Sequence, residues 1–205
     1  MLEPSQNGIE TLMKFYKFAM SNVELTIRFL LEETELANEN NPLCSDTKIR
    51  SRLKELTSIT DKCQRRHINN QDVEAITTNI RDIAGVRLIC EYQDEVYEAL
   101  DLIKAHYGDN LLEVEDYIKN PKPSGYRSIH CIIAVPVANR IIPVEVQLRT
   151  ECQEDWARFE GKVRYKKSHR QELTKDCSNF LNDYAKTCAE ADANKTKIRI
   201  SSAFS

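Results

Sequence analysis

The sequence has little glycine and no long apolar run. Only five of its 205 residues are glycine, and no apolar run approaches the roughly 18 residues that a membrane-spanning helix needs. The first ten residues, MLEPSQNGIE, have neither the basic region nor the apolar stretch of a secretion signal. We therefore expect a cytoplasmic protein without a membrane segment.

The cysteine and histidine patterns exclude two further classes of protein. None of the seven cysteines lies in a CxxC pair, and the four histidines show no HxxxH spacing. The number of cysteines is odd, and Cys90 and Cys131 lie in apolar, β-like runs, as is typical of reduced and buried thiols. We therefore expect neither a disulfide framework nor a dedicated zinc site.

Charge is balanced over the whole chain but not along it. The net charge of −3 argues against a general nucleic-acid-binding protein. Between Lys48 and Arg66, however, seven basic residues stand against two acidic ones. This local excess of positive charge indicates a small polyanion as the ligand.

The apolar periodicity predicts helices at both ends of the chain and a sheet between them. Helical spacing covers residues 9–37, 47–66, 73–80, 94–108 and 171–193, with a further helix from residue 151. Alternating or continuous apolar runs predict strands at 83–92, 111–117, 127–137 and 141–149. The last residues, KIRISSAFS, are expected to fray. These elements predict an α/β (α+β) fold with a mixed, largely antiparallel sheet of four or five strands and flanking helices.

One basic segment carries groups that suit a chain of phosphates. If it is helical from about residue 54, then Lys54, Ser58 and Lys62 share one face. The nearby Arg52 can clamp a phosphate or stack on a base. Taken alone, the segment fits a solvated basic face better than a phosphate site.

Two further segments offer carboxylates. Asp82 precedes a buried strand, where a carboxylate can hold Mg²⁺ together with substrate phosphates or can pair with a neighbouring arginine. Glu145, Gln147 and Arg149 alternate along a later strand and therefore share one of its faces. They fit either an ordinary half-exposed strand or a wall of base or metal ligand, amide and phosphate clamp. Spacing alone does not place Asp82 beside Glu145.

The fourth segment is the loop YIKNPKPSGYRSIH, residues 117–130. Its two prolines stiffen the chain, and Gly125 permits a tight turn. Tyr126 can offer its ring to a base, and His130 follows along the next strand. A hairpin loop with a packed tyrosine and a structural histidine is the alternative.

Together and in this order, these segments resemble the synthetase domain of the RelA/SpoT family. The matching stretches are RLKELTSITDK (52–62), RDIAGVRLIC (81–90), DYIKNPKPSGYRSIH (116–130) and PVEVQLRTECQEDWARFEGKVRYK (143–166). The chain length is similar to that of the small, stand-alone alarmone synthetases. The resemblance implies a sheet of nucleotidyltransferase type in residues 47–166, preceded by a helical arm (1–46) and followed by a helix and tail (167–205).

The resemblance also implies an activity. Such a GTP diphosphokinase transfers the pyrophosphate of ATP to the 3′-hydroxyl of GDP or GTP, releases AMP and so makes the stringent-response alarmone (p)ppGpp. No His-Asp dipeptide occurs in the chain, so the hydrolase activity of the long family members is not expected. The short members are commonly tetramers, which implies a homo-oligomer, and regulation by RNA or by a bound alarmone is left open.

Site residues carry over by motif position. Asp82 and Glu145 would be the catalytic pair. Asp82 would hold Mg²⁺, and Glu145 would either help to hold it or accept the proton of the 3′-hydroxyl. The residues implied for ATP are Arg52, Lys54, Ser58, Lys62 and Arg87. Those implied for the acceptor nucleotide are Lys122, Ser124, Tyr126, His130, Gln147 and Arg149, with Tyr126 stacked on guanine.

Two positions depart from the family pattern. Ser124 stands where an Asn commonly precedes the GY pair, and Gly161 stands where a His is common. They leave open a toxic relative that pyrophosphorylates tRNA 3′ ends or adenosine nucleotides. A non-catalytic regulator that binds nucleotides or RNA is a further alternative, against which the retained Asp82 and Glu145 argue.

Overall fold

A mixed five-stranded sheet forms the centre of the protein, whose computed structural model describes residues 4–37, 47–70, 72–166 and 174–203. The strand order is β1-β2-β5-β4-β3. The strands are β1 (Lys48–Leu53), β2 (Ala84–Cys90), β3 (Leu111–Asp116), β4 (Ile129–Val137) and β5 (Arg140–Thr150). Only the β2–β5 pair is parallel in this sheet, and the other neighbours are antiparallel. The expected mixed, largely antiparallel sheet is confirmed.

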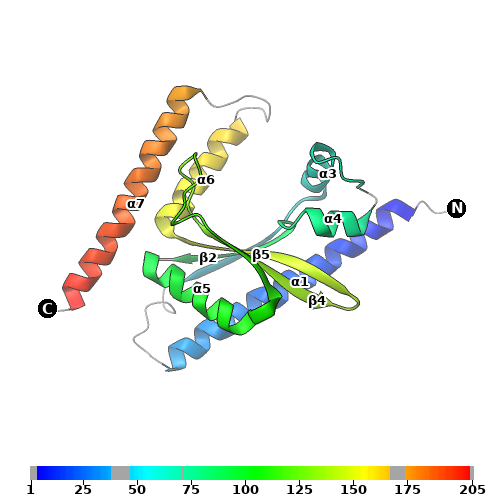
Figure 1. Cartoon of the computed structure of the whole chain (residues 1–205), viewed down its shortest axis with the longest axis horizontal. Helices are drawn as coiled ribbons and strands as arrows, with labels where there is room; N and C mark the ends of the chain where they lie inside the picture. The colour runs from blue at the N-terminus through cyan, green and yellow to red at the C-terminus, as the bar shows by residue number, and fades with distance from the viewer. Residues whose placement is uncertain (1–3, 38–46, 71, 167–173, 204–205) are drawn as a thin grey trace.

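One face of the sheet is covered by α1 (Pro4–Ala37) and α5 (Gln93–Tyr107), as Figure 1 shows. α1 buries a stripe of side chains three or four residues apart: Leu12, Tyr16, Ala19, Val23 and Ile27. This stripe shares one hydrophobic core with α5 and with the inward residues of β5, which are Val144, Val146 and Leu148. The N-terminal helix thus covers the sheet.

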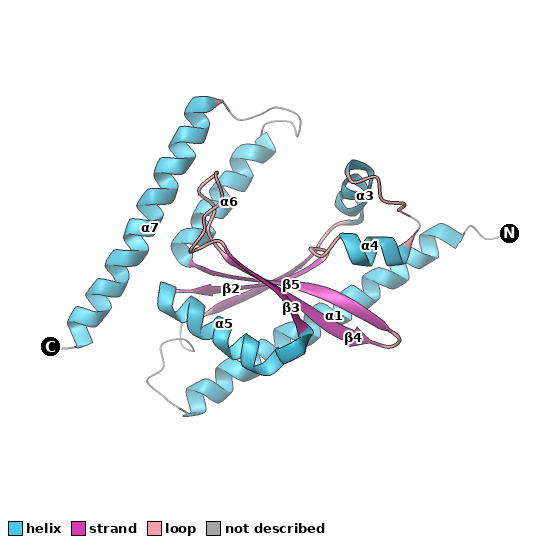
Figure 2. Ribbon diagram, viewed as in Figure 1, coloured by secondary structure: helices cyan, strands magenta, loops and turns pink. Residues whose placement is uncertain are grey.

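The opposite face carries a pair of helices at each end (Figure 2). α3 (Leu56–Arg65) and α4 (Val73–Asn79) stand at one end, and α6 (Glu151–Lys166) and α7 (Lys175–Ala203) at the other. A short 3₁₀ helix, η1 (Gly108–Asn110), links α5 to β3. Alternate residues of a strand point to opposite faces, so Glu145, Gln147 and Arg149 face the space between the two helix pairs.

The expected helix over 47–66 is wrong in its first half, which forms the edge strand β1. Ile49 and Leu53 are four residues apart, a spacing that fits one helical turn and also two strand repeats. Pairing with β2 decides the outcome, because each residue from Lys48 to Leu53 lies opposite a residue of that strand. The helix begins only at Leu56.

The expected fraying of the last residues is wrong over 197–203, because α7 continues to Ala203. Arg199 fixes this end: its Nη1 lies 3.0 Å from Oε1 of Glu95, and its guanidinium lies 4.1 Å from the centre of the Tyr92 ring. Six cysteines of the described chain are free, and Cys44 lies outside it. No helix among the described residues is long and apolar enough to cross a membrane.

Candidate functional site

The polar face of the sheet brings the four predicted segments together. Strand register places Arg87 of β2, Gln147 of β5 and His130 of β4 side by side in one row. In the next row, Gly85 of β2 lies beside Glu145. The parallel pairing of β2 with β5 brings the basic segment and the Asp82 segment to the strand that carries Glu145.

Asp82 lies just before β2 and binds two lysines. Its Oδ2 accepts a hydrogen bond from Lys54 Nζ at 2.8 Å, and its Oδ1 accepts one from Lys62 Nζ at 2.7 Å. Burial alone would raise the pKa of this carboxyl, but the two ammonium groups outweigh burial and lower it. Lys54 precedes α3 and Lys62 lies within it, so the two lysines do not share a helical face as predicted. They nevertheless meet at the Asp82 carboxylate.

The two arginines that flank Asp82 in sequence pair elsewhere. Arg81 Nη1 lies 2.7 Å from Glu113 Oε2, and Arg87 Nη1 lies 3.0 Å from Glu154 Oε1. Asp82 is therefore no simple turn carboxylate bound by its sequence neighbours. Its partners are two of the lysines that the sequence assigns to phosphates.

Glu145 belongs to a closed ring of hydrogen bonds on the polar face. Its Oε1 lies 3.1 Å from His130 Nδ1, and His130 Nε2 lies 2.7 Å from the Tyr126 hydroxyl. Arg149 Nη2 donates to that hydroxyl at 3.0 Å and also to Gln147 Oε1. Gln147 Nε2 donates to Glu145 Oε2 at 2.7 Å and completes the ring.

This ring keeps the Glu145 carboxylate ionised. Burial alone would raise the pKa of Glu145, and the charge of Asp82 acts in the same direction. The hydrogen bonds from His130 and Gln147 outweigh both, so the pKa lies below its ordinary value of 4.5. A deprotonated carboxylate in this place can accept a proton or ligate a cation.

Tyr126 is half-buried and packs sideways against other rings. Its ring centre lies 6.1 Å from that of Trp156 and 6.2 Å from that of Tyr117. The Lys122 ammonium lies over both tyrosines, 4.1 Å from the Tyr117 ring centre and 5.4 Å from that of Tyr126. Burial raises the pKa of the Tyr126 hydroxyl, which keeps it a neutral hydrogen-bonding group.

Two pockets open on this face and share a wall. One, of about 410 Å³, is bordered by Lys62, Lys122 and His130 among others. The other, of about 380 Å³, is bordered by residues that include Arg52, Lys54, Arg87 and Gln147. Asp82 and Glu145 border both pockets. We call these the His130 pocket and the Arg52 pocket.

The pockets separate five of the eleven residues that the sequence assigns to the two nucleotides: Arg52, Lys54 and Arg87 border one pocket, and Lys122 and His130 border the other. Among the ATP residues, Lys62 borders the His130 pocket instead, and among the acceptor residues, Gln147 borders the Arg52 pocket. Four predicted residues are not among the described residues that line either pocket: Ser58, Ser124, Tyr126 and Arg149. Tyr126 and Arg149 contact the site through the ring of hydrogen bonds.

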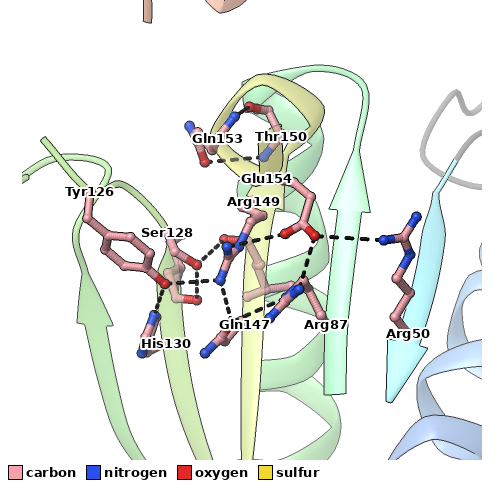
Figure 3. A network of polar contacts seen from close by, with 12 residues as sticks. Arg50, Arg87, Tyr126, Ser128, His130, Gln147, Arg149, Thr150, Gln153 and Glu154 are labelled. Atoms are coloured by element: carbon pink, nitrogen blue, oxygen red, sulfur yellow. Dashed lines mark hydrogen bonds and ion pairs between the residues drawn. The ribbon is translucent and has the colours of Figure 1, made fainter. Parts of the chain in front are cut away.

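Three site residues escape the sequence reasoning: Glu154, Arg50 and Gly85. Figure 3 shows Glu154 among three arginines. It is placed there by a capping box at the start of α6, in which Gln153 N donates to Thr150 Oγ1 at 3.1 Å and Thr150 N donates to Gln153 Oε1 at 3.2 Å. The T-x-x-Q spacing after a strand could have predicted this helix start, but not the partners of Glu154.

Asp82 and Glu145 fit a magnesium ion that arrives with a nucleotide. The described residues contain no group of three or more Asp, Glu, His or Cys side chains placed to hold a metal ion alone. Two carboxylates that border both pockets nevertheless match the preference of Mg²⁺ for one or two carboxylates plus substrate phosphates.

Known proteins share both the sequence and the fold. Residues 51–170 match the family model described as "Region found in RelA / SpoT proteins". GTP pyrophosphokinase YwaC of Bacillus subtilis is 36% identical over 179 residues, which cover 85% of this chain and 80% of that protein.

Solved structures agree in architecture. The structure of small alarmone synthetase 2 from Bacillus subtilis has a TM-score of 0.77 at 30% identity and covers 96% of this chain and 100% of its own. Small alarmone synthetase 1 from the same organism, bound to its product pppGpp, has a TM-score of 0.80 at 23% identity, with 95% and 97% covered. This second likeness is one of fold.

Proposed function

Because the chain belongs to the RelA/SpoT family, we propose that it is a (p)ppGpp synthetase, which transfers pyrophosphate from ATP to the 3′-hydroxyl of GDP or GTP and releases AMP. One observation supports this activity above all. Two pockets, each lined by several Lys and Arg side chains, meet at a pair of carboxylates, Asp82 and Glu145. A reaction between two nucleotides requires this arrangement, with the reacting atoms at the shared wall.

We assign ATP to the Arg52 pocket. Arg52 and Arg87 offer guanidinium groups that can stack on a base or bind phosphate, and Lys54 lies beside them. Lys62 reaches the same carboxylate as Lys54, so both ammonium groups stand where the pockets meet. There they can neutralise the charge that develops on the transferred pyrophosphate. Ser58 of α3 is half-buried one turn before Lys62 and adds a hydroxyl on this side.

We assign the guanosine nucleotide to the His130 pocket, where Lys122 lies over the Tyr126 ring. Ser124 belongs to the same loop and stays a predicted contact of this nucleotide. The 3′-oxygen attacks the β-phosphorus of ATP, the bond from that phosphorus to the oxygen bridging the α-phosphorus breaks, and AMP leaves. The hydroxyl proton passes to Glu145, whose lowered pKa keeps it ionised to receive it.

Mg²⁺ fits this site through Asp82 and Glu145 together with the phosphates of ATP. When bound, it supplies positive charge that lowers the cost of the charged transition state. Residues of the chain perform the remaining functions: Arg52 and Arg87 bind the donor, Gln147 and His130 hold the Glu145 carboxylate in place, and Lys54 and Lys62 counter charge.

An acceptor survey tests the proposal. Labelled ATP with Mg²⁺ would be offered GMP, GDP, GTP, adenosine nucleotides and tRNA in parallel, with AMP release and acceptor labelling as the readouts. We expect AMP release with GDP or GTP, and a rate at least about 10²-fold lower with Glu145→Gln. Labelling of tRNA or of adenosine nucleotides alone would replace this function with that of a toxic relative. A folded protein that binds nucleotides but labels no acceptor would instead be a non-catalytic regulator.

Self-association is the second part of the proposal, and the outer face of α1 supports it. Four large apolar side chains lie on this face: Phe18, Leu25, Phe29 and Leu36, exposed by 59%, 69%, 53% and 85%. Their spacings of seven, four and seven residues are symmetric about Ile27. A second α1 in antiparallel orientation would therefore place Phe18 against Leu36 and Leu25 against Phe29.

Charge favours the same antiparallel pairing. Lys14 and Lys17 lie toward the start of α1, and Glu32, Glu33 and Glu35 lie toward its end. In a homodimer built on α1, each basic end would lie over an acidic end of the partner helix. A tetramer would require a second contact surface in addition.

Sedimentation tests this assembly. The native chain at micromolar concentration should sediment as an oligomer, and Leu25→Glu should shift it toward the monomer. Leu112→Glu is the matched control, because Leu112 is also exposed, by 55%, but lies on β3. A monomeric native chain, or an unchanged oligomer in Leu25→Glu, would contradict the proposed surface.

A further inference from the structure

Glu154 is a buried carboxylate that binds arginines from three strands. Its side chain is 10% exposed. Oε1 lies 3.0 Å from Arg87 Nη1 and 3.8 Å from Arg50 Nη1, and Oε2 lies 3.2 Å from Arg149 Nη1 (Figure 3). Arg50 and Arg87 are direct cross-strand neighbours, so their like charges would repel without an anion between them.

The arginines on either side of Glu154 connect it to different pockets. Arg87 borders the Arg52 pocket, to which we assign ATP. Arg149 is 2% exposed and donates to the Tyr126 hydroxyl, which is hydrogen-bonded to His130 in the wall of the other pocket. Glu154 is not among the described residues that line either pocket. It can act on a substrate only through these arginines.

We propose that Glu154 couples the two nucleotide pockets, so that ATP bound in one raises affinity for the guanosine nucleotide in the other. The inference rests on the proposed function. Glu154 divides its charge between Arg149 and two arginines of the ATP pocket, Arg87 and the more distant Arg50. When ATP engages Arg87, the carboxylate is left to Arg149 and holds it more firmly. A firmly held Arg149 fixes the Tyr126 hydroxyl, and through it His130 and the acceptor pocket.

Gln147 supports this route because it touches the same two arginines. Arg87 Nε donates to its Oε1 at 3.3 Å, and Arg149 donates to the same oxygen. Gln147 also donates to Glu145, so a change in the Arg87 contacts reaches the catalytic carboxylate through one side chain. The coupling therefore passes through direct side-chain contacts and requires no movement of the sheet.

Calorimetry with two ligands measures the coupling directly. GDP would be titrated into the protein with and without α,β-methylene-ATP and Mg²⁺; this analogue cannot transfer its pyrophosphate because the bond that must break is replaced. In the native chain we expect the analogue to tighten GDP binding by about 5-fold or more, in the range of ordinary allosteric coupling. In Glu154→Gln we expect the factor to fall below about 2-fold.

Two further variants keep the test decisive. Glu154→Asp retains the charge beside buried Arg149 but is too short to bridge both arginines, so it should fold and still show reduced coupling. Glu151→Gln is the matched control: Glu151 lies in the same helix and pairs with Lys48 at 2.5 Å, away from the arginines. It should leave the coupling factor unchanged.

The deciding quantity is the ratio of the GDP affinities measured with and without the ATP analogue. A merely structural role of Glu154 would lower the affinity for both nucleotides and leave this ratio unchanged. A native ratio in both Glu154 variants, or a ratio of one in the native chain, would overturn the inference while the proposed function stood. Failure of the native chain to bind either nucleotide would overturn the proposed function itself, and the coupling with it.

Discussion

Replacing Asp82 with Asn should destabilise the free protein and not only stop its reaction. The change removes the charge bound by Lys54 and Lys62, whose side chains are 21% and 19% exposed. A hydrogen bond to a charged group contributes roughly 1.5–3 kcal/mol, but the released ammonium groups regain some water and the Asn oxygen can still accept one bond. We therefore expect a loss of about 2 kcal/mol, or about 4–8 °C in Tm for a chain of this size.

The pH dependence of this loss is fixed by the sign of the pKa shift. The folded pKa of Asp82 is lowered, so its stabilisation is present above the unfolded pKa of about 3.9 and is lost as the pH falls through the folded pKa. The Tm difference between native and variant protein should thus be full at pH 7 and shrink below about pH 4.

Thermal unfolding followed by circular dichroism, without nucleotide, measures the difference. Asp61→Asn is the matched control, because Asp61 is exposed on α3 and belongs to no ion pair among the residues that the structure describes. It should leave Tm within about 1 °C. Equal Tm values for Asp82→Asn and the native chain at pH 7, or a difference that grows in acid, would refute the reasoning.

Three further predictions concern the base and the loop. Glu145→Gln should lower kcat by about 10²- to 10⁴-fold while nucleotides still bind. AMP release measures the rate and calorimetry measures nucleotide affinity; an equal loss of affinity would contradict the assignment of Glu145 as the base. His130→Phe should move the acid limb of the kcat/KM profile to higher pH, since burial would then raise the pKa of Glu145 without the opposing hydrogen bond; an unmoved limb would exclude Glu145 as the titrating group. Gly125→Ala should cost about 2–4 kcal/mol in urea unfolding, because Gly125 has φ of +87° and a Cβ there would lie 2.6 Å from Cβ of Ala185; an unchanged midpoint would contradict this packing.

Local patterns predict most elements of this fold but not their pairing. The two-residue period of 141–149 correctly separates the buried valines from Glu145, Gln147 and Arg149, because strand geometry is a local property. Edge strand β1 is missed because its two apolar residues fit both periods, and the deciding contact with β2 lies about 35 positions away in sequence.

In the site, too, local patterns predict the residue types but not which residues lie together. The segment order identifies the residue types, and two predicted phosphate lysines do converge on Asp82. The proximity of Asp82 to Glu145 depends on the parallel β2–β5 pair, which no spacing encodes. Glu154 is missed altogether, since an acidic residue in the first turn of a helix is ordinary capping chemistry until the arginines of three strands surround it.

These pairings mean that four cations of the site are already neutralised before a substrate arrives. The ion pairs are those of Lys54 and Lys62 with Asp82, and of Arg87 and Arg149 with Glu154. A phosphate that binds one of these four cations must therefore replace an internal carboxylate, so the energy gained is the difference between two ion pairs. The replaced Asp82 is then free to ligate the cation that accompanies the nucleotide, whereas Glu154 is too buried to leave and transfers its charge to Arg149. The ion pairs of Asp82 are thus exchanged for phosphate at one wall of the Arg52 pocket. Those of Glu154, behind the other wall, couple the two pockets.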